Sequence, residues 1–149
     1  MKVIFDTNVV LDCLLKRKPF HEISAWLMNR VEGGLLDGSL CANSITTIEY
    51  LIAKNVGRST AKRAIKHLLA VFEIAEVNKA ILDSAIVSPL ADFEDTVIYQ
   101  SGLGVGVDAV VTRDAKGFKK SEIPVYSPED LYALILEVNE NEKENARTD

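Results

Sequence analysis

The sequence predicts an α/β fold, a three-layer α/β/α sandwich around a mainly parallel sheet of about five strands. Short β-rich apolar runs alternate with longer helical stretches, which is the pattern of βαβ units on a parallel sheet. The 149 residues, 48% apolar and 26% charged, suit one globular domain with its own core. Capping and turn residues at the ends of the helical stretches give further support to this division of the chain.

Each predicted element follows from a local pattern. The expected strands are Lys2 to Phe5, Leu40 to Ala42, Phe72 to Val77, Ala109 to Thr112 and Pro124 to Tyr126. Helical apolar spacing covers Thr7 to Leu15, Phe20 to Val31, Ser44 to Asn55, Ser59 to Val71, Lys79 to Val87 and Asp92 to Gly102. A last helix is expected from Pro128 to about Val138, because Ser127 suits its N-cap and Pro128 its first position.

The end of the chain differs from the rest in composition. The segment from Glu137 to Asp149 is rich in Glu, Asn and Lys and has almost nothing apolar, so we expect it to fray or to be disordered. We therefore expect one domain over residues 1–138, followed by an acidic tail over residues 139–149.

Several classes of protein are disfavoured by the composition. No apolar run reaches the ~20 residues of a membrane span. Asp6 interrupts the apolar start where a signal peptide would continue, so we expect a cytoplasmic protein without a membrane partner. Cys13 and Cys41 form no Cys-x-x-Cys pair, which disfavours a zinc or redox site. The net charge of -5 argues against a protein that coats nucleic acid with a broad basic surface.

Two acids follow predicted strands directly. Asp6 comes after the first strand, and Asp114 stands just beyond Val110, Val111 and Thr112. In an open parallel sheet, ligands bind outside the carboxyl ends of the strands, so these two carboxylates are expected at one edge. A single Asp in such a place is equally well explained as a helix cap. Two at the same edge favour a functional site.

Other acids are less clearly marked. Glu49 lies in a largely apolar stretch, but its spacing alone fits a surface residue of an amphipathic helix better than a site residue. Asp92, Glu94 and Asp95 stand at a helix start, where capping and the helix dipole explain one or two of them. Asp92 and Asp95 share one helical face, and their crowding favours a bound cation. Mg²⁺ or Mn²⁺ would suit such oxygen ligands.

Motifs for other chemistry are missing from the sequence. It contains no P-loop, no Gly-x-Ser-x-Gly elbow and no His-Glu-x-x-His pair. His21 and His67 are single residues on predicted amphipathic helices. Without a histidine base, water activated by a metal ion is the natural nucleophile.

The chain resembles the PIN-domain family over nearly its whole length, and its size is nearest to the bacterial VapC-type toxin ribonucleases. The resemblance rests on the order and spacing of four short segments: Val3-Ile4-Phe5-Asp6-Thr7-Asn8, Glu49 within Ser44 to Tyr50, Asp92-Phe93-Glu94-Asp95, and Val111-Thr112-Arg113-Asp114 followed by Phe118. It departs from the family where small residues commonly follow the third acid, because Thr96, Val97, Ile98 and Tyr99 are bulkier.

This resemblance implies a parallel sheet between helices and a metal-dependent endoribonuclease that hydrolyses RNA phosphodiesters and leaves 5′-phosphate and 3′-hydroxyl ends. By the resemblance, Asp6, Glu49, Asp95 and Asp114 would bind Mg²⁺ or Mn²⁺, with Asp92 as an outer acid or as the ligand in place of Asp95. Asn8 would support Asp6, and Thr112 would orient the end of its strand.

Basic residues near the same edge are candidates for holding the RNA backbone. Arg113, Lys116, Lys119 and Lys120 are placed best, and the segments Lys16 to Lys18 and Arg58 to Lys66 are second choices. For the second of these segments, a solvated helix face explains the charge better. The resemblance also implies a small antitoxin as partner and a homodimer.

Two alternative functions remain. A PIN fold kept only as a protein-interaction module would usually lack one of the metal acids, whereas all four are present here. A haloacid-dehalogenase-like phosphatase also starts with a strand and an Asp nucleophile. Its motif needs a second Asp as general acid two residues later, where this chain has Asn8.

Overall fold

A parallel sheet of five strands forms the middle layer of the molecule, which a computed structural model describes over residues 1–90 and 92–149. The strand order is β3-β2-β1-β4-β5, and every neighbouring pair is parallel. The strands are β1 (Lys2–Phe5), β2 (Asp37–Cys41), β3 (Glu73–Ala75), β4 (Ala109–Val111) and β5 (Val125–Tyr126). The predicted α/β fold with a mainly parallel sheet is confirmed.

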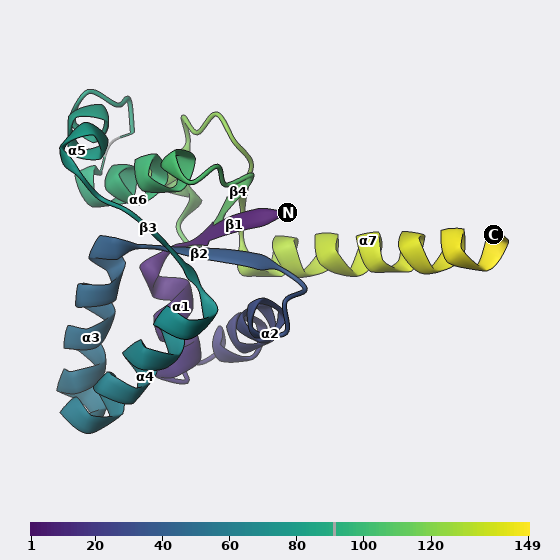
Figure 1. The fold of residues 1–149 in the computed structure, drawn as a ribbon, viewed down its shortest axis with the longest axis horizontal. Coiled ribbons are helices and arrows are strands. Elements are labelled where there is room, and N and C mark those ends of the chain that lie inside the picture. Colours follow the sequence, from purple (N-terminus) through teal and green to yellow (C-terminus); the bar gives the residue numbers. More distant parts are fainter. Residues whose placement is uncertain (91) are drawn as a thin grey trace.

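Helices cover both faces of this sheet (Figure 1). One face packs against α1 (Thr7–Leu14), α2 (His21–Glu32), α3 (Ala42–Val56), α4 (Arg58–Val71) and the start of α7 (Pro128–Thr148). The other face packs against α5 (Lys79–Ile86) and α6 (Phe93–Gly104), and the short 3-10 helix η1 (Ala115–Phe118) follows β4. The three layers expected from the sequence are therefore present.

The two cores are separated by the sheet because neighbouring residues of a strand point to opposite faces. In β1, Val3 and Phe5 belong to the core under α1 to α4, whereas Ile4 belongs to the core under α5 and α6. All three side chains are fully buried. A strand buried on both faces must be apolar throughout, and this explains the continuous apolar run that precedes Asp6.

The predicted element boundaries differ from the observed ones by a few residues, and β2 shows the physical reason best. It begins at Asp37 rather than at Leu40, and its residues Gly38 and Ser39 are buried. A Cβ atom at Gly38 would lie 2.7 Å from side-chain atoms of Phe72 and Val31, so the strand passes there only because the residue is glycine. The polar start of β2 resembles a turn in the sequence, yet tertiary packing makes it a strand.

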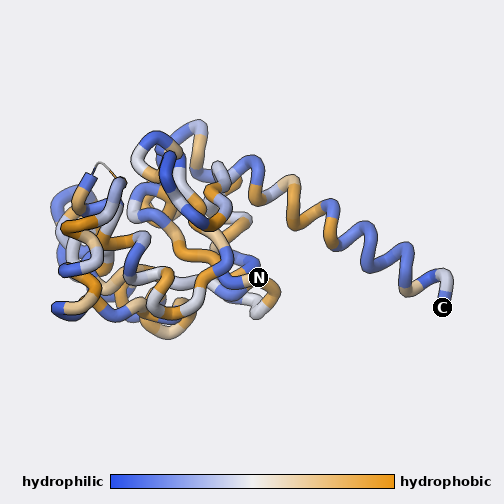
Figure 2. Tube along the Cα trace, turned by 90° about the horizontal axis from the view of Figure 1, so that it is seen from above, coloured by the Kyte–Doolittle hydropathy of each residue, from blue (hydrophilic) through white to orange (hydrophobic). Residues whose placement is uncertain are grey.

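The last helix is longer than expected. We expected its end near Val138 and a disordered tail, but α7 continues to Thr148 and extends away from the body of the molecule (Figure 1). Beyond Val138 it is largely hydrophilic (Figure 2). Glu, Lys, Arg and Ala have high helix propensity, so the composition that suggested disorder also suits a solvated helix. The division into residues 1–138 and 139–149 stays a prediction.

None of the helices formed by residues 1–90 and 92–149 combines the length and the apolar character that a membrane span requires.

Candidate active site

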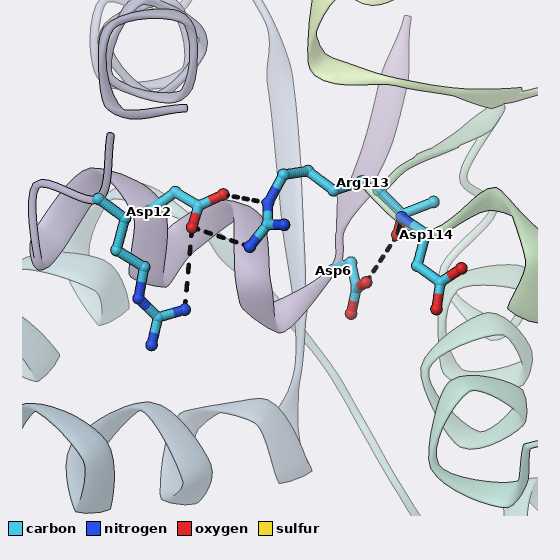
Figure 3. Close-up of polar contacts among 6 residues, drawn as sticks. Asp6, Asp12, Arg113 and Asp114 are labelled. Carbon is cyan, nitrogen blue, oxygen red and sulfur yellow. Dashed lines mark hydrogen bonds and ion pairs between the residues drawn. The ribbon is translucent and has the colours of Figure 1, made fainter. Parts of the chain in front are cut away.

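Asp6 and Asp114 lie side by side at the carboxyl edge of the sheet (Figure 3). Asp6 follows β1 and Asp114 follows β4, and these adjacent strands are held in register by pairs such as Phe5 with Val111. The backbone N–H of Asp6 donates to the carbonyl of Val111 at 2.9 Å, which extends the pairing to the first acid. Asp6 is buried, whereas Asp114 is exposed. The sheet therefore brings together two acids that are far apart in sequence.

Thr112 connects these two acids directly. Its buried hydroxyl donates to the carboxylate of Asp6 at 2.7 Å and accepts from the backbone N–H of Asp114 at 3.0 Å. The two bonds fix the Asp6 side chain and the turn that carries Asp114 (Figure 3). The orienting role of Thr112 near a metal ion stays a prediction from the resemblance.

The third acid of this edge is Asp95, in the first turn of α6. Asp92 is the N-cap of that helix, and its side chain accepts from the N–H of Asp95 at 3.0 Å. The carboxylate of Asp95 lies against η1, where a Cβ atom at Gly117 would overlap its Oδ2 atom. Because Asp92 is engaged in capping, Asp95 is the better candidate ligand of the two.

The charges of these acids interact. Burial and the negative charges of Asp6, Asp92, Asp114 and Glu94 raise the pKa of Asp95 to about 6. Burial also raises the pKa of Asp6, with a smaller contribution from Asp114. Hydrogen bonds from Thr112 and from the backbone of Thr7, together with the charge of Arg113, act in the opposite direction on Asp6. Asp6, Asp95 and Asp114 therefore form a cluster of negative charge that a cation would stabilise.

The raised pKa of Asp95 predicts how stability depends on pH in metal-free protein. Between its unfolded value of 3.8 and about 6, the folded chain holds a proton that the unfolded chain has lost. The free energy of unfolding therefore falls as the pH rises through this window. We expect metal-free Asp95→Asn to melt at a higher temperature than the wild type at pH ~7, with a difference that disappears toward pH ~4.

Thermal melting of both proteins across this pH range checks the prediction. Glu129→Gln is the matched control, because it removes an exposed acid from the first turn of α7, away from the cluster. A difference between Asp95→Asn and wild type that did not vary with pH would contradict the electrostatic cause.

An ion pair that was not predicted from the sequence lies close to the acid cluster and stabilises the loop at this edge of the sheet. Asp12 of α1 is fully buried, and its carboxylate accepts from Nε of Arg113 at 2.5 Å and from a terminal nitrogen of Arg113 at 3.1 Å (Figure 3). The Arg113 guanidinium also lies 4.0 Å from the ring centroid of Phe20, and Arg17 lies 3.8 Å from Asp12. An acid inside the apolar run from Val9 to Leu14 was the available signal for this pair.

This pair engages Arg113, one of the four basic residues predicted to hold RNA, and its role in RNA binding stays a prediction. Its guanidinium points back to Asp12 and joins the loop between Thr112 and Asp114 to α1. Arg113 therefore has a structural role at the edge. The other three candidates, Lys116, Lys119 and Lys120, are exposed on η1 and just after it.

Two other predicted site residues do not join the cluster. Glu49 is exposed on α3 and is not among the charges that raise the pKa of Asp6 or Asp95. It lies instead with Tyr50, Lys54 and Arg58 around a surface hollow. Asn8 is exposed, and among the residues that the structure describes it forms no side-chain hydrogen bond with Asp6. Their assigned roles stay predictions from the resemblance.

The donor set suits a hydrated divalent ion. Over the described ranges, no three or more His, Cys, Asp or Glu side chains form a group that could hold a metal ion, so these residues show no closed cage of protein ligands. Mg²⁺ does not need one, because it usually keeps several waters and binds one or two carboxylates directly. Asp6, Asp95 and Asp114 supply only carboxylate oxygen, and burial together with the negative charges of the neighbouring acids raises the pKa of Asp95. These residues therefore fit Mg²⁺ or Mn²⁺.

The fold and the site define a class of protein. A family model described as the PIN domain matches residues 2–116, so the chain belongs to the PIN domain family. Ribonuclease VapC1 of Aquifex aeolicus (strain VF5) is 27% identical over 135 residues, which cover 87% of this chain and 92% of that protein.

Solved structures share the fold. The sarcin-ricin loop cleaving toxin VapC20 of Mycobacterium tuberculosis superposes with a TM-score of 0.65 at 12% identity, over 80% of this chain and 95% of that one. A toxin-antitoxin complex from Klebsiella pneumoniae gives a TM-score of 0.65 at 16% identity, over 85% of this chain and 98% of that one. At these identities the likeness establishes a common fold.

Proposed function

We propose that this chain is a metal-dependent endoribonuclease that hydrolyses RNA phosphodiesters, and that it is the toxin of a type II toxin-antitoxin pair. The observation that carries the proposal is the convergence of Asp6, Asp95 and Asp114 at one edge of the sheet in a PIN domain. The ribonuclease relative, which aligns over most of both chains, supports the choice of RNA. Because the chain belongs to the PIN family, the phosphatase alternative is set aside.

The carboxylates of the cluster would bind the metal ion. The substrate would contact that ion from the solvent-exposed side of the cluster. Asp6 is fixed by the hydroxyl of Thr112, and Asp114 is fixed through its own N–H on the same hydroxyl. When bound, Mg²⁺ or Mn²⁺ would supply the Lewis acidity that makes water nucleophilic near neutral pH and offsets charge on the phosphate. In-line attack of water would leave 5′-phosphate and 3′-hydroxyl ends. By resemblance, Glu49 is assigned as a fourth acid.

Lysines near the cluster would position the RNA. Lys116, Lys119 and Lys120 are exposed on the segment that follows Asp114, and they can contact phosphates without reading sequence. Arg113 would act indirectly, because its contact with Asp12 holds the turn between Thr112 and Asp114. We therefore assign phosphate binding at this edge to the three lysines.

An antitoxin partner is part of the proposal. The Klebsiella pneumoniae structure with the same fold is a toxin-antitoxin complex, and this supports a small antitoxin for the present chain. A homodimer is a further expectation from the family resemblance.

Removal of the metal tests the nuclease. Purified protein should cleave a structured RNA when Mn²⁺ or Mg²⁺ is added, and an excess of EDTA should stop the cleavage, because the acids alone offer no nucleophile. Gel analysis of end-labelled RNA, with treatment that detects 5′-phosphates, measures both the cleavage and the product ends.

Two outcomes would contradict the proposal. Cleavage that continues in EDTA would exclude a metal-dependent reaction. If no RNA were cleaved and calorimetry detected no binding of Mn²⁺, the chain would belong with the PIN folds that act only as protein-interaction modules.

A further inference from the structure

A basic surface lies on the α3–α4 hairpin, outside the acid cluster. Between Tyr50 and Phe72 the sequence has no Asp or Glu but five Lys or Arg residues, in a chain whose net charge is -5. The five, which we call the hairpin cations, are Lys54, Arg58, Lys62, Arg63 and Lys66. In an acidic protein, such a group of positive charges is expected either to form ion pairs within the structure or to bind an anionic ligand.

The structure does not use these charges internally. All five side chains are exposed, and within residues 1–90 and 92–149 none of them forms an ion pair. Arg63 donates hydrogen bonds to the hydroxyl groups of Ser59 and Thr60. By contrast, Lys2, Lys79 and Arg113 each pair with a carboxylate. The hairpin cations are therefore free to bind an anion.

Their spacing also concentrates the charge on one face of α4. Arg58, Lys62 and Lys66 follow one another at intervals of four residues, which places them on neighbouring turns of one helical face. Like charges at this spacing destabilise a helix. The arrangement opposes helix stability, and a polyanion bound along this face would relieve the repulsion.

A hollow beside this face adds an aromatic group. Glu49, Tyr50, Ala53, Lys54 and Arg58 line an open depression of about 400 Å³ between α3 and α4. Tyr50 is 61% exposed. Surfaces that bind single-stranded nucleic acid combine cations for the backbone with aromatic rings on which bases stack. Tyr50, Lys54 and Arg58 offer this combination within one hollow.

The hollow is connected to the acid cluster by α3 itself. Thr7, the residue after Asp6, donates its hydroxyl to Ser44 near the start of α3 at 2.8 Å. From Ser44 to Lys54 the chain rises by roughly 15 Å along α3. Figure 1 shows α3 leaving the edge of the sheet and α4 returning beside it. An RNA strand that lies along this hairpin would reach the acids within a few nucleotides.

We infer that the α3–α4 hairpin binds single-stranded RNA, with phosphates on the hairpin cations and a base stacked on Tyr50. The inference rests on the proposed function, since it adds the path of the substrate to the site. Charge complementarity favours RNA as the ligand of this surface, because RNA carries one negative charge per nucleotide and the hairpin carries five cations. An acidic protein is the competing occupant and is one outcome of the test.

The test measures binding without cleavage. Fluorescence anisotropy of a labelled, short oligouridine in EDTA gives the dissociation constant, because the absence of metal prevents hydrolysis. In the variant Arg58→Gln/Lys62→Gln we expect weaker binding. The slope of the logarithm of the binding constant against the logarithm of the salt concentration should also be smaller by about 1.4, because each phosphate contact with a single strand contributes about 0.7. Gln keeps the helix propensity of Arg and Lys.

A matched control removes the same charge elsewhere. Lys79→Gln/Lys143→Gln changes two exposed lysines of α5 and α7 and should bind like the wild type. Tyr50→Leu should weaken binding about 5-fold or more, whereas Tyr50→Phe, which keeps the ring, should not. Thermal melting should show that every variant is folded, with only small changes in the melting temperature, because all of these positions are exposed.

Three results would overturn the inference. The first is wild-type binding by the Arg58→Gln/Lys62→Gln variant, and the second is an equal loss in the control variant. The third is hairpin-dependent binding of labelled polyglutamate by a protein that shows no binding of oligouridine, which would indicate an acidic protein partner. The outcome is independent of the nuclease proposal. If RNA binding depends on the hairpin cations but no metal-dependent cleavage occurs, only the proposed nuclease activity is refuted. If RNA is cleaved but its binding does not depend on the hairpin cations, only the inference about the hairpin is refuted.

Discussion

Asp6→Asn should reduce metal-dependent RNA cleavage by more than about 100-fold, because loss of even an outer partner of a metal ligand typically costs 10 to 100-fold. Asn keeps the size of the side chain and an oxygen that accepts from the Thr112 hydroxyl, which lies 2.7 Å from the carboxylate of Asp6. What it removes is the negative charge. The loss of cleavage would therefore report the charge and not the shape of the site.

The same substitution should not lower the stability of metal-free protein. Burial raises the pKa of Asp6, so the folded chain disfavours its charged form. A neutral Asn avoids that penalty, and thermal melting near neutral pH should give an equal or higher midpoint. A variant that is inactive and no less stable would separate the catalytic role of Asp6 from a structural one.

Asp108→Asn is the matched control for both measurements. Asp108 stands just before β4, at the opposite edge of the sheet, and accepts from the N–H of Lys2 at 2.8 Å. Asn preserves that acceptor, so activity should stay at the wild-type level. If Asp6→Asn cleaved RNA as fast as the wild type, the assignment of the active site would be wrong.

Asp12→Ala should cause the largest loss of stability. It leaves the guanidinium of Arg113, only 28% exposed, without its carboxylate. Breaking a buried ion pair costs about 3 to 5 kcal/mol, and the partial exposure of Arg113 favours the lower value. For a chain of this length, 3 kcal/mol corresponds to a fall of roughly 10 °C in the melting temperature.

Asp83→Ala provides the comparison. Asp83 also pairs with a cation, Lys79, at 2.6 Å, but both side chains are largely exposed. Its removal should change the free energy of unfolding by only about 0.5 kcal/mol. The double variant Asp12→Ala/Arg113→Met, which removes both charges, should be less destabilised than the sum of the two single variants. Equal melting temperatures for wild type and Asp12→Ala would show that the pair contributes nothing.

The features that the sequence predicted well are those set by local patterns. Continuous apolar runs identified strands buried on both faces, and the acid after each of two such runs identified Asp6 and Asp114. These positions follow from topology, because parallel neighbours end at the same edge. Capping chemistry also placed the start of α6, and the structure then distinguished the cap, Asp92, from Asp95.

Other features depend on tertiary contacts and could not be read locally. The polar start of β2 becomes a strand through packing at Gly38. The ion pair of Arg113 with Asp12 could not be predicted, because the two residues are 101 positions apart in the sequence. The length of α7 was missed because a solvated helix and a disordered segment have similar compositions. Glu49 was singled out by the family motif, and the structure leaves it on the hairpin.

The close approach of Gly117 to Asp95 makes position 117 a means of attenuating the enzyme without changing its charge. A methyl group there would overlap the Oδ2 atom of Asp95, which must then swing out of its place against η1. All the acids and lysines would remain, so the electrostatic attraction of RNA would be preserved. If the proposed nuclease activity is correct, Gly117→Ala would weaken cleavage while RNA still binds, and this variant would suit the isolation of the substrate complex.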